Sequence, residues 1–92
     1  MIIRVLGEGQ YDVAERALGR LNQLDEVVEA AVEAGDEDAF RAALEDLLEC
    51  VRTVGVPHAV DDLVESDLVL PHPDASLAEV REMLADDGLI PG

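Results

Sequence analysis

Two histidines lie near carboxylates in the sequence, and these side chains could together coordinate a metal ion. His58 precedes Asp61 and Asp62, and His72 precedes Asp74. Imidazole and carboxylate ligands can bind a divalent cation, on which a small hydrolytic enzyme could be built. However, both histidines lie in proline-flanked loops, and neither group has the spacing of a helical or hairpin metal motif. We therefore expect no metal site, and a metal-dependent enzyme is an alternative hypothesis.

The other reactive residue types form no motif that is typical of catalysis. Gly7 and Gly9 follow a predicted strand, but Asp12 stands where the dinucleotide-binding fingerprint has its third glycine. Glu8 would also repel a phosphate. Cys50 is the single cysteine, so we expect a small buried thiol, with an intermolecular disulfide or a redox role as the alternative. The sequence thus predicts no catalytic residue and no cofactor, and we expect a protein that is not an enzyme.

The chain is strongly acidic, with 22 Asp and Glu residues against six arginines and a formal net charge of −16. Such a surface repels nucleic-acid phosphates and anionic lipids, so we expect no direct binding to nucleic acid. No stretch approaches the ~20 apolar residues of a membrane span, and the first residues lack the pattern of a signal peptide. We expect a cytoplasmic protein with a basic partner, although adaptation to a salty cytoplasm would explain the same charge.

Two long amphipathic segments predict an antiparallel helical hairpin. In the second segment, apolar residues recur three and four apart along one side of a helix: Phe40, Leu44, Leu47, Val51 and Val54. The first segment has a matching series, formed by Leu18, Leu21, Leu24, Val28 and Ala31 or Val32. Gly35 suits the left-handed position after a helix, and Asp36 suits the N-cap of the next. We predict helices over residues 13–34 and 36–54.

The N-terminal segment predicts a small sheet. Residues 2–11 are expected to form a strand or hairpin, because β-branched residues precede two glycines. Asp12 and Glu15 are then expected to form a capping box for the first helix. A strand at Asp67–Pro71 would pair with the N-terminal strand, since two strands alone are marginally stable.

The last third of the chain predicts a loop, a short strand and a helix. The loop and strand occupy residues 56–71. Ser76 and Glu79 form a capping box for a helix over residues 77–86, which Gly88 would end. The 92 residues are therefore expected to form one mostly helical α+β domain.

Acidic residues on the outer faces of the two predicted helices form the candidate partner-binding face. They are Glu26, Glu29, Glu33, Glu45, Asp46 and Glu49. Such a face could bind a helix rich in arginine or lysine, or it could simply be a solvated surface. Apolar positions outside the regular series, such as Val27 and Ala42, could also bind a partner or form a homodimer.

Several stretches of the sequence in combination resemble the PspAA family of small PspA-associated proteins. These stretches are Met1–Tyr11, Leu21–Asp25, Glu33–Glu37, Ser66–Pro71 and Gly88–Pro91. The resemblance covers essentially the whole chain and departs at Val13 and Ala14, where a proline would be expected. It implies a non-enzymatic cytoplasmic component that works with PspA, a coiled-coil protein that polymerises on stressed membranes, in the phage-shock response.

We therefore predict an adaptor whose acidic hairpin binds PspA or another protein of the same operon. PspA would recruit it to the inner face of the membrane. An acidic antagonist that occupies the basic surface of a DNA-binding regulator is an alternative hypothesis, as is the metal-dependent enzyme that uses His58, His72 and the nearby aspartates.

Repulsion among the carboxylates predicts that salt stabilises the fold. With a net charge of −16, screening beyond about 10 Å at 0.1 M salt weakens most of the repulsion between surface carboxylates. The Tm followed by circular dichroism should therefore rise from low to molar sodium chloride. A Tm that stays constant or falls over this range would contradict the prediction.

Overall fold

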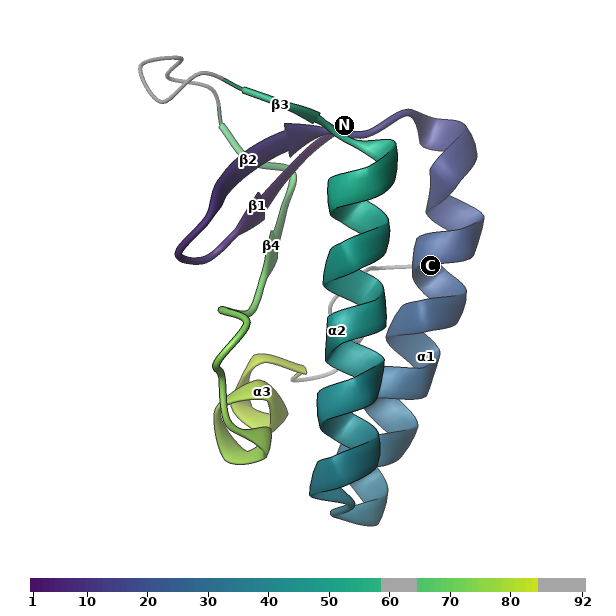
Figure 1. Ribbon diagram of the computed structural model, residues 1–92, viewed down its shortest axis with the longest axis vertical. Helices are drawn as coiled ribbons and strands as arrows, with labels where there is room; N and C mark the ends of the chain where they lie inside the picture. Colours follow the sequence, from purple (N-terminus) through teal and green to yellow (C-terminus); the bar gives the residue numbers. More distant parts are fainter. Residues whose placement is uncertain (59–64, 85–92) are drawn as a thin grey trace.

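The computed structural model describes residues 1–58 and 65–84, and within these ranges it contains a helical hairpin, a four-stranded sheet and a third helix (Figure 1). The helices are α1 (Leu18–Ala34), α2 (Glu37–Val54) and α3 (Leu77–Leu84), and a 3-10 turn, η1 (Glu15–Ala17), precedes α1. The strands are β1 (Ile2–Val5), β2 (Gly9–Asp12), β3 (Val56–Pro57) and β4 (Leu68–Leu70). The predicted class, mostly helical α+β, is confirmed.

The two long helices are joined by a tight reversal at Gly35 and Asp36. Gly35 adopts the left-handed conformation, with φ 68° and ψ 23°. Its N–H donates to the Val32 carbonyl (3.1 Å), and the Asp36 N–H donates to the Ala31 carbonyl (3.1 Å). This is the bonding of a Schellman motif, which satisfies the last carbonyls of α1. Asp36 also caps α2, because its Oδ1 accepts from the Ala39 N–H (3.1 Å).

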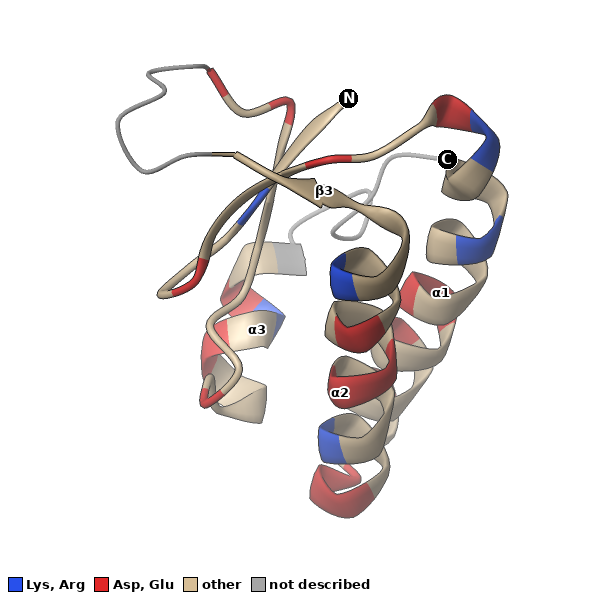
Figure 2. Cartoon of the chain, turned by 45° about the horizontal axis from the view of Figure 1, so that its top comes forward, with Lys and Arg blue, Asp and Glu red and all other residues tan. Residues whose placement is uncertain are grey.

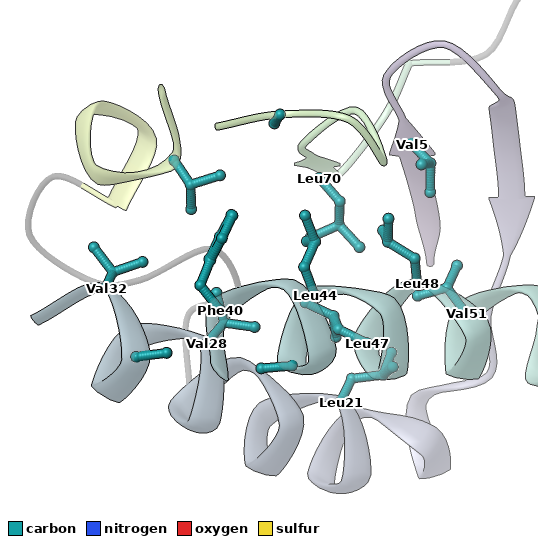
Figure 3. Close-up of a cluster of buried hydrophobic side chains, with 14 of the residues drawn as sticks. Val5, Leu21, Val28, Val32, Phe40, Leu44, Leu47, Leu48, Val51 and Leu70 are labelled. Atoms are coloured by element: carbon teal, nitrogen blue, oxygen red, sulfur yellow. The ribbon is translucent and has the colours of Figure 1, made fainter. Parts of the chain in front are cut away.

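The core lies between the hairpin and a second layer made of the sheet and α3 (Figures 1 and 3). Most of the predicted apolar series is buried there: Leu21, Val28, Ala31, Val32, Phe40, Leu44, Leu47 and Val51. Figure 3 shows Phe40 and Leu44 on the side of α2 that faces α3 and Leu70. The sheet therefore covers the hairpin toward the start of α1, and α3 covers it toward the reversal.

The burial of six hairpin residues differs from the prediction. Val54 is 43% exposed, and Leu18 and Leu24 are only half-buried, although all three belong to the predicted apolar series. Conversely, Asp25, Ala43 and Leu48 are buried outside the predicted series. The reason is that the sheet and α3 cover one side of the helix pair, so burial shifts toward that side.

The sheet has the strand order β3-β2-β1-β4. β1 pairs with β2 in antiparallel fashion and with β4 in parallel fashion, in a register that places Val5 opposite Leu70. Ile3, Val5 and Leu70 face the helices and are buried, whereas Val69 lies on the open face. The predicted pairing of the run after Asp67 with the N-terminal strand is confirmed. β3, which pairs with β2, lies in a segment that was predicted to be a loop.

The predicted start of the first helix at residue 13, with a capping box at Asp12, is wrong. Asp12 is the last residue of β2 and pairs with Ile2. The Val13 N–H then donates to the Met1 carbonyl (2.7 Å), and the buried Val13 side chain holds the chain extended. α1 consequently begins at Leu18, after η1, without a side-chain cap.

The N-terminus of α3 has the predicted capping box. The Glu79 N–H donates to Ser76 Oγ (3.1 Å), and Glu79 Oε1 accepts from the Ser76 N–H (3.4 Å). Arg81 links α3 to the end of α1 by donating to the Val32 carbonyl (2.8 Å). The predicted end of this helix, at residue 86 and Gly88, lies outside the described residues.

Replacing Gly35 with alanine should lower the free energy of unfolding by about 1 kcal/mol. A Cβ at this position would meet no atom within 4 Å, so the expected loss comes from the positive φ and not from a clash. Gly35→Asn is the matched variant and should cost less, because asparagine tolerates this conformation better. Urea unfolding followed by circular dichroism measures both. An alanine variant as stable as the original chain would contradict this account of the reversal.

Candidate partner-binding surface

The six carboxylates predicted to bind a partner lie on both helices of the hairpin, where Figure 2 shows acidic positions along α1 and α2. On α1, Glu26, Glu29 and Glu33 are spaced three and four apart and therefore share one edge, called here the α1 acidic edge. On α2, Asp46 and Glu49 line a groove between the helices. The carboxylates thus occupy more than one edge of the hairpin.

Glu45 lies on a different side of α2 from the groove. It is four residues after Arg41 and seven before Arg52, so these three side chains share one flank of the helix. That flank faces the second layer: Arg41 contacts the Pro73 carbonyl, and Arg52 contacts Glu8 in the β1–β2 turn. A partner that contacts Glu45 would therefore approach a different side of α2 from one that enters the groove.

The α1 acidic edge concentrates negative charge. Glu29 is partly buried, and this burial raises its pKa. The neighbouring carboxylates of Asp25, Glu33 and Glu26 raise the pKa further, because each disfavours a second negative charge nearby. The carboxylates of the α1 acidic edge therefore repel one another, and a bound basic partner would reduce this repulsion.

A groove of about 350 Å³ runs between α1 and α2. The residues that line it all come from the hairpin: Arg20, Leu24, Asp46, Glu49, Cys50, Thr53 and Val54. Cys50 is two residues from Leu48, which is about 200° around the helix axis. Because buried Leu48 belongs to the core, the groove opens on the side of the hairpin away from the sheet.

A charged cluster that the sequence analysis missed fixes the β1–β2 turn on α2. Arg52 donates to both carboxylate oxygens of Glu8, with a distance of 2.8 Å from Nε to Oε1. Tyr11 donates its hydroxyl to the same oxygen (3.3 Å). The Arg52 hydrogen bonds hold the pKa of Glu8 below its usual value. Glu8 thus pairs with Arg52 within the fold, and this pairing competes with binding of Glu8 to a partner.

The two histidines have separate environments. His58 Nε2 lies 4.0 Å from Asp12 Oδ2. His72 Nδ1 accepts from the Asp74 N–H (3.0 Å) and lies 3.8 Å from the Asp74 carboxylate. Across residues 1–58 and 65–84, no three His, Cys, Asp or Glu side chains are grouped so that they could hold a metal ion. Asp61 and Asp62 lie outside the described residues.

These features define a small acidic α+β protein in which the described elements leave a charged, grooved side of the helical hairpin uncovered. Within the described part of the chain, no helix is long and apolar enough to cross a membrane. The family model described as PspA-Associated protein, PspAA, matches residues 1–92, and the chain belongs to this family. The resemblance found in the sequence is thereby confirmed. No curated protein and no solved structure gives a significant match.

Replacing Glu29 with glutamine should increase the free energy of unfolding at pH 7 by less than about 1 kcal/mol. The raised pKa means that ionised Glu29 is less favourable in the folded chain than in the unfolded chain. The gain should disappear as the pH falls below about 4.3, the unfolded value, because both states are then protonated. Urea unfolding across this pH range measures it, with Glu82→Gln, at an exposed position of α3, as the control. A gain that persists at low pH would contradict the ionisation of Glu29, disfavoured by burial and by neighbouring carboxylates, as its cause.

Proposed function

We propose that this protein is a non-enzymatic adaptor that binds PspA, or another protein of the same operon, and so regulates the membrane-stress response. The observation that carries the proposal is membership, over the whole chain, of the PspA-associated family. The structure supports it with a long hairpin whose exposed side carries carboxylates at helical spacing. Such a surface is suited to a helical partner with basic residues.

The α1 acidic edge supports the choice of an α-helical partner. Glu26 and Glu33 are exposed, and Glu29 lies between them. Their spacing of three and four residues matches the spacing at which lysines or arginines share one face of another helix. An approaching basic helix would therefore neutralise several carboxylates at once.

The proposal includes a location. We infer that the protein works in the cytoplasm and reaches the inner face of the membrane through PspA. Its net charge of −16 opposes direct adsorption to anionic lipid, whose surface is also negative. Contact with the membrane would therefore depend on the partner.

Calorimetry with the cognate PspA tests the proposal. A triple variant of the α1 acidic edge, Glu26→Gln, Glu29→Gln and Glu33→Gln, should bind about tenfold more weakly at low salt, if each charge pair contributes about 0.5 kcal/mol. Added salt should weaken binding of the original chain more than binding of the variant, because fewer charge pairs remain to be screened.

The matched control removes three carboxylates elsewhere, with Glu65→Gln, Asp74→Asn and Glu82→Gln. These residues are exposed and lie outside the hairpin. The control should retain the original affinity, whereas an equal loss in both triple variants would show that net charge alone matters. Absence of binding at every salt concentration would remove the adaptor proposal. Displacement of a DNA-binding regulator from DNA would instead support the acidic antagonist.

A further inference from the structure

The groove between α1 and α2 is an apolar surface that the described part of the fold leaves uncovered. Leu24 and Cys50 are half-buried at its base, and Val54 is 43% exposed at one end. Val27 follows Leu24 by three residues on the same side of α1 and is 55% exposed. These are the exposures expected of side chains that a further helix would cover.

The shape of this surface fits a helix. Two antiparallel helices that pack at about 8–10 Å present a continuous furrow between them, into which the side chains of a third helix can insert. Toward the reversal the same side of the hairpin carries exposed alanines: Ala30, Ala34, Ala39 and Ala42. Their small side chains would allow a third backbone to approach closely along the length of the furrow.

The charges at the groove select the chemistry of its occupant. Asp46 and Glu49 line the α2 side, whereas Arg20 is the charged residue that lines the α1 side, near the start of α1. The α2 rim is therefore negative and would pair with a basic side chain of an occupant. A second copy of this chain would bring another net charge of −16 against the first, which electrostatic repulsion disfavours.

We propose that this groove docks one amphipathic helix of the partner, with its apolar stripe on Leu24, Cys50 and Val54 and with lysine or arginine on the flank that faces Asp46 and Glu49. The inference rests on the proposed function and deepens it by naming the surface and the chemistry of the helix. The apolar stripe supplies contacts that salt does not screen, and the basic flank pairs with Asp46 and Glu49.

The single cysteine of the chain provides a direct test, because Cys50 lines the groove. Alkylation of Cys50 by iodoacetamide should become about tenfold slower or more when the cognate PspA is present in saturating excess, as occupancy covers the thiol. The control chain carries Cys50→Ala and Val69→Cys, which places the thiol on the open face of the sheet, where Val69 is 42% exposed. Its alkylation rate should not change.

A pair of substitutions with matched exposure supplies the second readout. Val54→Gln, in the groove, should weaken PspA binding about tenfold in calorimetry, because one buried valine contact is lost. Val69→Gln, on the sheet, should bind within twofold of the original chain. Circular dichroism establishes that both variants are folded, and both positions are comparably exposed in the free protein, at 43% and 42%.

The outcomes separate the two proposals. If PspA binds the original chain while Cys50 alkylation and Val54→Gln affinity are unchanged, the groove is not the site, and the adaptor function stands. If PspA does not bind at all, the proposed function is contradicted, and so is the docking of a PspA helix in the groove. If Cys50 is protected without PspA in proportion to protein concentration, and ultracentrifugation shows a dimer, a second copy occupies the groove and the inference is overturned.

Discussion

The reversal at Gly35 and Asp36 is the constraint on which the arrangement of the molecule depends. Once the amides of both residues bond back to the last turn of α1, α2 must return alongside it. The apolar sides of the two helices then meet, and the sheet and α3 complete the core from one direction. Across residues 1–58 and 65–84, no third layer covers the opposite side of the hairpin. Within this part of the chain, the open groove is therefore a consequence of the architecture.

Charge restricts what could bind the side of the hairpin that residues 1–58 and 65–84 leave open. The core is almost entirely aliphatic, and Asp25, at 2% exposure, is the buried carboxyl among the described residues. The remaining described carboxylates must share the surface, and several fall on the hairpin because α1 and α2 supply much of it. Burial raises the pKa of Glu29, and repulsion from neighbouring carboxylates raises it further, so an approaching positive charge would favour ionised Glu29. The same carboxylates that disfavour self-association thus favour a basic partner.

The hairpin could be predicted from the sequence because it depends on local signals: apolar spacing, a glycine at the C-cap and an aspartate at the N-cap. The pairing of Glu8 with Arg52 could not, since 44 positions separate the two residues and only the folded turn brings them together. The predicted start of the first helix at residue 13 was wrong for a related reason. The pairing of Asp12 with Ile2 in the sheet overrides the tendency of Asp12 to cap a helix. For the candidate site, the acidic residues could be identified from the sequence. Which of these residues lie on the α1 acidic edge and which line the groove depends on how each helix is rotated about its own axis, and only the folded structure gives this.

The charged rim and the apolar base of the groove would act on different stages of association with a partner. Asp46 and Glu49 on the α2 rim would accelerate encounter with a basic helix and repel anionic surfaces, and salt weakens both effects. Apolar contacts at Leu24, Cys50 and Val54 depend on exclusion of water, so they retain their contribution in concentrated salt. If the acidity of this chain reflects a salty cytoplasm, charge alone would be a poor basis for a lasting complex, because screening would remove most of it. A groove with an apolar base and an acidic α2 rim resolves this conflict, since the rim supplies selectivity and the base supplies affinity.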